Sequence, residues 1–328
     1  MLTNLGDLID RTKDSSTTAL IDCLDWEHPR EYSHAEIDHL ADACARGLLG
    51  RNPGGAPLHR GNTVAILSAN RAEFLIAYFG IMRAGLVAVP VNHKFPRDTI
   101  EFVMRDAGVK LVLCDTERKA SVPADIPSVE FGPGFESLLD PGDFETVLPE
   151  PGETAMVLYT SGSTGRPKGV PLSHAGHLWA VESRLRTVPP GEHRLIVAAP
   201  LFHMNALGTS KFAFAAHASV VLMPQFDARR YVEAIGRFGV TWLTSVPTML
   251  AMMVREKDTI AKTDLSSVRT VRMGSAPTTQ NLIDDLRTLF PSATVMNAYG
   301  TTEAGPVVFG PHADGRTRPD MALGWPLA

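Results

Sequence analysis

The sequence predicts an α/β protein made of two packed subdomains, each with a mostly parallel β-sheet flanked by helices. Short β-branched runs alternate with helical patterns through almost the whole chain, which is typical of a parallel sheet. With 328 residues, 44% of them hydrophobic, the chain can form more than one packed unit. We expect a first subdomain at about 55–190 and a second at 1–54 plus 191–310, with 311–328 starting a third.

Three buried strands with two helices between them form the first set of elements. The strands are expected at 63–67, 86–91 and 109–114. Asn70 can cap the first helix, with Glu73 as its capping-box partner. Pro96 lies near the start of the second helix, and Gly108 fits the position after its end. The order β-α-β-α-β implies parallel strands, and an irregular connector rich in proline, glycine and acids follows at 123–152.

A second set of strands occupies the later part of the chain. These strands are expected at 194–199, 219–223, 240–245, 268–273 and 293–297. Asp227 is placed to cap a helix that runs to Phe238 and ends at Gly239. Open α/β sheets bind ligands beyond the carboxyl ends of their strands, so motifs that follow strands can converge on one cleft.

Composition excludes several classes of function. The net charge is −5, from 31 basic and 36 acidic residues without a basic block, which argues against a nucleic-acid partner. Three cysteines lack metal-ligand spacing, so we expect buried, reduced thiols in a cytoplasmic protein. The most apolar stretch, 74–91, contains Arg83 and is interrupted by glycine and proline, so we predict no integral membrane segment. The sequence does not indicate an oligomeric state.

The loop at 159–170, after the buried strand at 155–159, combines glycines, hydroxyl side chains and one lysine. Glycines let backbone N–H groups approach an anion, hydroxyls add donors, and Lys168 adds a mobile positive charge. This composition predicts a site for a polyphosphate. A Walker loop is a poor match because Pro167 precedes the lysine and Gly169 follows it, where Ser or Thr would coordinate magnesium.

Three further motifs follow in order along the chain, at 200–207, 273–277 and 297–303. Together with the loop, they resemble the signatures of the adenylate-forming superfamily, and most closely its acyl-CoA synthetase and 4-coumarate–CoA ligase branch. The resemblance extends from the turn at 67–70 to 324–327. It implies the N-terminal domain of such an enzyme, with two α/β subdomains and the ligand between them.

The resemblance implies ATP, Mg²⁺ and CoA as ligands and a small-molecule carboxylic acid as substrate. The acid would attack the α-phosphorus of ATP, and CoA would then displace AMP, as in a fatty or aromatic acyl-CoA synthetase. The acid–thiol ligase reaction requires charge developing on phosphate to be neutralised, so positioning and electrostatics should dominate.

The same resemblance assigns roles to individual residues. Lys168, Thr302, Glu303 and His203 are the expected catalytic residues, with Glu303 as the Mg²⁺ ligand, Thr302 at the α-phosphate and His203 orienting the acid. Tyr299 would stack on adenine. The nucleotide-binding residues are expected to be Thr160, Ser161, Gly162, Ser163, Thr164, Gly165, Lys168, Gly274, Ser275, Ala276, Pro277, Asn297, Ala298, Tyr299, Gly300, Thr301 and Thr302.

Two patterns have simpler explanations. His174 and His177 are three residues apart on an expected helix, but no third ligand is visible, so we interpret them as structural. No Gly-x-Ser-x-Gly motif is present, which argues against a Ser-His-Asp hydrolase.

The substrate acid is expected to lack an α-amino group, because no acidic residue stands beside Phe202 and His203, where the superfamily's amino-acid-activating members place an aspartate. Residues expected near its tail are mostly apolar or small, which favours an aromatic or medium-chain acid: Ala206, Leu207, Ser210, Trp242, Gly274 and Met296.

Compared with the superfamily, the sequence ends before the C-terminal lid domain, which would carry the ribose-binding aspartate and a catalytic lysine. We therefore expect this fragment to bind nucleotide weakly and to be nearly inactive alone. A nucleotide- or acyl-binding regulatory module and an acyl-AMP ligase remain alternatives, and luciferase activity a remote one.

Overall fold

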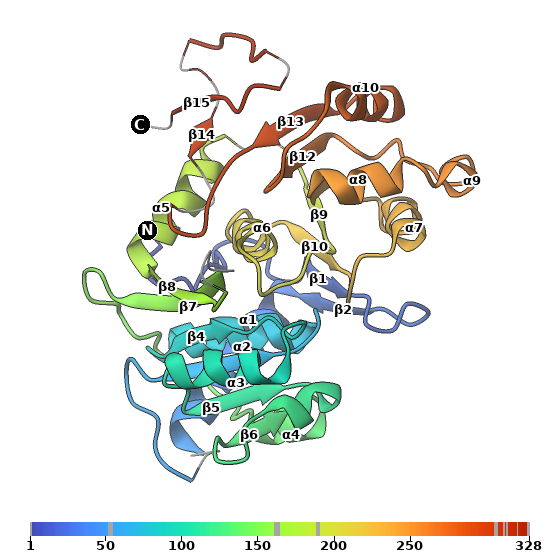
Figure 1. Cartoon of the computed structure of the whole chain (residues 1–328). Coiled ribbons are helices and arrows are strands. Elements are labelled where there is room, and N and C mark those ends of the chain that lie inside the picture. The colour runs from blue at the N-terminus through green and yellow to red at the C-terminus, as the bar shows by residue number, and fades with distance from the viewer. Residues whose placement is uncertain are drawn as a thin grey trace. The chain divides into compact units, whose positions relative to one another are not determined.

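The computed structural model describes residues 2–51, 55–160, 165–187, 191–304, 308–310, 312, 314–319 and 321–326. The chain divides into two compact units, each with its own mostly parallel sheet and flanking helices (Figure 1). The first unit contains residues 1–17, 32–179 and 201–203, and the second contains 18–31, 180–200 and 204–328. The predicted α/β class is therefore confirmed.

The first unit is built on a six-stranded sheet in the order β6-β5-β3-β4-β7-β8. Its strands are β3 (Thr63–Leu67), β4 (Val87–Pro90), β5 (Leu111–Cys114), β6 (Ser128–Glu130), β7 (Thr154–Thr160) and β8 (Lys168–Ser173). All neighbours are parallel except the β7–β8 pair, which is antiparallel. Its helices are α1 (His34–Gly50), α2 (Ala72–Arg83), α3 (Arg97–Asp106) and α4 (Pro133–Leu138), and a 3₁₀ turn spans Thr116–Ser121.

The second unit has a seven-stranded sheet in the order β13-β12-β11-β9-β10-β1-β2. Its strands are β1 (Thr18–Asp22), β2 (Arg30–Ser33), β9 (Arg194–Val197), β10 (Ser219–Leu222), β11 (Trp242–Ser245), β12 (Thr270–Gly274) and β13 (Thr294–Ala298). The helices are α6 (Met204–Ala215), α7 (Ala228–Phe238), α8 (Pro247–Met253), α9 (Lys257–Ile260) and α10 (Gln280–Leu289). A two-stranded sheet pairs β14 (Phe309–Gly310) with β15 (Trp325–Pro326). Both α5 (His174–Leu185) and β2 contribute residues to both units.

Strand alternation gives the second sheet two different faces. Leu243, Val271 and Met273 point into a core shared with α7, α8 and α10. Residues two apart on a strand share a face. Trp242, Thr270 and Arg272 therefore lie on the opposite face, toward α5 and α6.

The predicted strands are found with small shifts at their ends, and two helices have both predicted ends. Pro96 is the N-cap of α3, and Gly108, with φ 62°, follows its C-cap Ala107. The Asp227 side chain accepts a hydrogen bond from the Arg230 N–H at 2.8 Å, and Gly239 ends α7 with φ 61°. The predicted cap at Asn70 is wrong, because Arg71 is the N-cap of α2 and makes no side-chain cap bond. The connector at 123–152 is less irregular than expected, since it contains β6 and α4.

The first unit includes part of the N-terminal segment that was expected in the second subdomain. Residues 32–54 belong to the first unit because α1 packs against α2. Arg83, 1% exposed, joins these helices by contacts from its Nη2 to Asp38 Oδ1 at 2.7 Å and from its Nη1 to Asp42 Oδ1 at 2.6 Å. Its Nε also donates to the Gly6 carbonyl at 2.7 Å. Residues 1–17 also belong to the first unit, and residues 18–31 belong to the second.

Replacing Arg83 by Met should destabilise the protein strongly. The change leaves the Asp42 carboxylate buried without its cation, while Asp38 keeps its ion pair with Arg11. Breaking a buried pair costs about 3–5 kcal/mol. Urea denaturation measures this loss. Arg105→Met is the matched control, because Arg105 is half exposed in its ion pairs with Glu101 and Asp125 and should cost less than about 1 kcal/mol. Equal losses in the two variants would contradict the prediction.

Candidate functional site

The predicted phosphate loop connects the two strands of a β-hairpin in the first unit. Thr160, the last residue of β7, pairs with Lys168, the first residue of β8. Gly165 has φ 91°, a value that disfavours other residues, and Lys168 is exposed. The predicted ligands Ser161, Gly162, Ser163 and Thr164 lie outside the described residues. Because a strand starts at Lys168 and α5 starts only at His174, the lysine does not open a helix as in a Walker loop.

The segment with His203 is anchored to the first unit by a long-range hydrogen bond. The Asn70 side-chain oxygen accepts from the Leu201 N–H at 2.8 Å, so Asn70, which precedes the N-cap Arg71, binds a distant segment of the chain. Phe202 is buried, with its ring 5.1 Å from the ring of His93 in an edge-to-face contact. The turn at 67–70 was recognised in the sequence, but its role in positioning the segment with His203 was not predicted.

His203 follows the anchored residues and immediately precedes α6. Its side chain is exposed at the surface, yet desolvation, followed by the nearby Lys94 charge, lowers the pKa of His203 from its ordinary value. A lowered pKa favours the neutral imidazole at pH 7, which both donates and accepts hydrogen bonds. This state suits orientation of a polar ligand better than attraction by charge.

A small-residue turn follows β12 in the second unit. Gly274 pairs with Ala298 of β13 so closely that a Cβ added to Gly274 would lie 2.7 Å from the Ala298 carbonyl oxygen. The next residue, Ser275, has φ 67°, and its hydroxyl lies 3.4 Å from the Asn205 amide nitrogen. Ser275, Ala276 and Pro277 are exposed, so the turn presents small groups and backbone at the carboxyl end of the sheet.

The next motif follows β13 at the same end of the sheet. Tyr299 is 47% exposed, with its ring 6.0 Å from that of Phe309. The Thr301 hydroxyl accepts from the Ala304 N–H at 2.9 Å. Gly300 and Thr302 are half-buried, and Glu303 is exposed. The structure thus brings the motifs at 274–277 and 297–303 together along one strand pair.

The Glu303 carboxylate forms no ion pair with the described residues. Within that part of the chain, no three His, Cys, Asp or Glu side chains form a metal-binding group. A single carboxylate still fits Mg²⁺, which keeps several waters and takes few protein ligands. Glu303 as a magnesium ligand therefore stays a prediction.

The predicted site residues fall into two groups, one in each unit. Thr160, Gly165, Lys168 and His203 belong to the first unit, and the described residues of the other two motifs belong to the second. His174 has a structural contact instead, since its Nδ1 accepts from the Leu5 N–H at 3.1 Å. The three cysteines are buried and free, as predicted.

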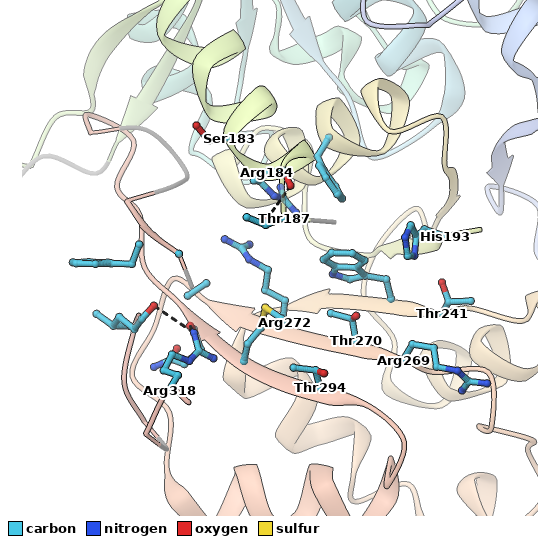
Figure 2. A pocket seen from close by; sticks show the side chains of 18 of the residues that line it. Ser183, Arg184, Thr187, His193, Thr241, Arg269, Thr270, Arg272, Thr294 and Arg318 are labelled. Carbon is cyan, nitrogen blue, oxygen red and sulfur yellow. Dashed lines mark hydrogen bonds between the residues drawn. The ribbon is translucent and has the colours of Figure 1, made fainter. Parts of the chain in front are cut away.

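A cavity of about 930 Å³ lies within the second unit, on the face of its sheet toward α5 and α6 (Figure 2). Trp242 and Met296, both expected near the acid's tail, line it, together with Asn297 and Ala298 of the last motif. Ala206, Leu207, Ser210 and Gly274 do not line it. Several arginines also face this cavity, beside its apolar side chains. These arginines either alternate with core residues along a strand or lie outside the motifs. The motifs therefore did not predict that arginines face the cavity.

The sequence matches the AMP-binding enzyme family over residues 10–328. The chain belongs to this family. It is 28% identical to 4-coumarate–CoA ligase 1 of Solanum tuberosum, over 87% of this chain and 55% of that protein. It is 30% identical to feruloyl-CoA synthase of Amycolatopsis sp., over 84% of this chain and 55% of the other. The chain thus spans about half the length of these curated relatives.

Solved structures of the family have the same fold. The N-terminal domain of FACL13 from Mycobacterium tuberculosis superposes with a TM-score of 0.81 at 25% identity, over 97% of this chain and 86% of that one. ATP-bound MatB from Rhodopseudomonas palustris gives a TM-score of 0.85 at 26% identity, over all of this chain and 65% of the other. None of the helices in the described ranges has the length and apolar character needed to cross a membrane.

Substituting Gly274 by Ala should disturb the strand pair that carries both motifs. The added methyl group would meet the Ala298 carbonyl, a backbone atom that cannot turn away, so we expect a loss of about 1–3 kcal/mol. Chemical denaturation checks the value. Gly50→Ala serves as control, because a Cβ at this position of α1 meets nothing within 4 Å and should be neutral or stabilising. Unchanged stability of Gly274→Ala would contradict the proposed close approach.

Proposed function

We propose that this chain is the nucleotide-binding part of an acid–CoA ligase. A carboxylic acid and ATP would form an acyl-adenylate and pyrophosphate, and the CoA thiol would then displace AMP to form a thioester. Membership of the AMP-binding family and the similarity to 4-coumarate–CoA ligase and feruloyl-CoA synthase support this reaction. The observation that carries it is the pairing of Gly274 with Ala298, which sets two family motifs side by side.

The nucleotide base and ribose would bind beyond the carboxyl ends of β12 and β13. The exposed turn at Ser275, Ala276 and Pro277 leaves room for a planar base against backbone, and the exposed Tyr299 ring offers a face for stacking. A parallel α/β sheet places ligands at this edge. ATP-bound MatB, with the same fold, supports the assignment.

The phosphates require neutralisation of negative charge. Lys168, exposed at the start of β8, would contact the β- and γ-phosphates, and the glycines around it allow the loop to move with them. Thr302 would donate its hydroxyl to the α-phosphate, and Glu303 would hold Mg²⁺. The metal, when bound, shields phosphate charge as the acid's carboxylate approaches.

The acid's carboxylate would be oriented by His203. Neutral imidazole, favoured by the lowered pKa, donates one hydrogen bond without trapping the carboxylate as a tight ion pair. The Asn70–Leu201 bond fixes the backbone two residues before this ring, so the orientation is set by the first unit's own fold. Holding ATP and the acid's carboxylate in an attack geometry would convert a bimolecular reaction into an effectively intramolecular one.

Replacing Lys168 by Ala should weaken ATP binding more than AMP binding, because AMP lacks the phosphates that the lysine would contact. We expect about a tenfold loss for ATP and little change for AMP, measured by isothermal titration calorimetry. Lys110→Ala removes an exposed lysine just before β5 and should leave both affinities unchanged. Equal losses for ATP and AMP would contradict the assigned contact.

His203→Ala should reduce acid activation without weakening ATP binding. We expect about a hundredfold lower rate of acid-dependent ATP–pyrophosphate exchange, because the carboxylate loses its orienting group. The assay is run on the 328-residue chain, where we propose that exchange is weak, and on the chain extended by any sequence that follows Ala328 in its gene. ATP binding without exchange for any acid, in both forms, would instead favour a binding or regulatory module. Acyl-adenylate that accumulates with CoA present would favour an acyl-AMP ligase.

A further inference from the structure

Five arginines and one acidic residue, Glu192, line the cavity of the second unit, and three of the arginines come from different elements. Arg184 comes from α5, Arg272 from β12, and Arg318 from the segment between β14 and β15. Figure 2 shows Arg272 rising from the sheet toward the helix that carries Arg184, with Arg318 beside the neighbouring strand. We call these residues the arginine cluster. All three belong to one compact unit, so the fold of that unit sets their arrangement.

Arg184 is the most deeply buried member. Its side chain is 9% exposed, and its Nη1 donates to the Gly208 carbonyl at 3.1 Å. The guanidinium carbon lies 4.0 Å from the centre of the Phe212 ring, a cation–π contact. Its Nη2 is buried without a hydrogen-bond partner among the described residues. An unpaired donor on a buried guanidinium is costly, so a ligand that accepts from it would be stabilised.

Neither of the other two members pairs with a carboxylate of the described residues. Arg318 donates from its Nη1 to the carbonyls of Asn297 at 3.0 Å and Leu323 at 3.4 Å, which fixes its position without neutralising it. In the described parts of the chain, no Asp or Glu forms an ion pair with any member of the cluster. Buried Arg83, by contrast, is bound by two carboxylates.

The electrostatics agree with this geometry. Desolvation, then the charge of Arg272, lowers the pKa of Arg184, and desolvation, then the charge of Arg318, lowers that of Arg272 to about 10. Guanidinium groups stay protonated at neutral pH even so. The arginine cluster therefore holds three cations, each repelled by a neighbour, that an anion would stabilise together.

The remaining wall of the cavity suits an organic acid. Phe212, Trp242, Met296 and Trp325 supply apolar and aromatic surface. Asn297 and Ala298 also line the cavity, and they belong to the motif assigned to the nucleotide. A ligand that fills the cavity would thus lie beside the nucleotide, with an anionic group at the arginine cluster and its apolar part against these side chains.

We propose that the acid activated here carries a second anionic group, which binds the arginine cluster, so that the substrate is an apolar or aromatic diacid. This inference rests on the proposed function and adds a second charge to the expected aromatic or medium-chain acid. The chemistry recognised is an anionic oxygen group on an organic body. A phosphate of CoA offers the same chemistry from another source, and the test separates the two.

The experiment compares binding of matched acids to the 328-residue chain, followed by tryptophan fluorescence and calorimetry. The diacid is 3-(4-carboxyphenyl)propanoate, and the monoacid is 3-phenylpropanoate. We expect the diacid to bind at least about tenfold more tightly, the effect of one charge-assisted hydrogen-bonded pair. In Arg272→Gln the two acids should bind within about twofold of each other, and Arg272→Lys should keep part of the preference.

Arg229→Gln is the matched control, since it removes one surface arginine, paired with Glu233 on α7, from the same unit. It should preserve the diacid preference. The apo Arg272→Gln chain should melt no lower than wild type, because it loses a cation repelled by its neighbours, so misfolding would be visible as a lowered Tm. Equal binding of both acids to wild type overturns the proposal, as does a preference that survives in Arg272→Gln.

CoA and ATP serve as further probes on the same samples. The diacid proposal would be overturned by three results together: CoA competes with the diacid, Arg272→Gln weakens CoA binding, and the two acids bind with equal affinity. These results would assign the cluster to a CoA phosphate. ATP binding reports the proposed function separately. Intact ATP binding without diacid preference removes only this inference, whereas loss of both ATP and acid binding removes the proposed function as well.

Discussion

A parallel sheet needs cover on both faces, and the second unit meets this requirement unequally. On one face, α7, α8 and α10 close a continuous apolar core over Leu243, Val271 and Met273. On the other, α5 and α6 leave a cavity over Trp242 and Arg272. Along β11 and β12, side chains on one face therefore stabilise the core, and those on the other face line the cavity proposed to bind a ligand.

The two kinds of buried arginine in this protein illustrate different physical solutions. Arg83 is neutralised by Asp38 and Asp42, and it holds α1 and α2 to the N-terminal segment. The arginine cluster has carbonyl and aromatic contacts but no described carboxylate. A buried cation whose donors are all paired within the protein stabilises the fold. A buried cation with unpaired donors can instead bind an external anion.

The sequence predicted those parts of the fold that depend on local patterns. Buried strands and the Asp227 and Gly239 ends of α7 follow from side-chain periodicity and capping chemistry, so they were found. Asn70 was misassigned because its oxygen bonds to Leu201, 131 residues later, and a capping pattern cannot reveal such a partner. The short strands β1 and β2 and the contact between α1 and α2 were missed for the same reason, since they are determined by distant pairing.

The candidate site shows the same division. Its motifs were recognised because they are contiguous, and Gly274 and Ala298 were found paired at the edge expected for a ligand. The cavity lining was not predicted, because Arg184, Arg272 and Arg318 come from three separate elements and none of them lies at a motif position expected to bind ligand. Their convergence depends on tertiary packing, which single-sequence patterns do not encode.

The two units are interleaved along the chain, and this has a consequence for how the protein is made. β1 pairs with β10, some 200 positions later in the chain, and the Asn70 side chain accepts a hydrogen bond from Leu201, which is also synthesised much later. A ribosome adds about 5–20 residues per second, so each unit must remain incomplete for many seconds of synthesis. During that interval the emerging chain carries an unpaired strand and an unsatisfied turn. Neither unit corresponds to a continuous stretch of the gene, so the first can be completed only after residue 203 has been made and the second draws on residues from 18 to 328.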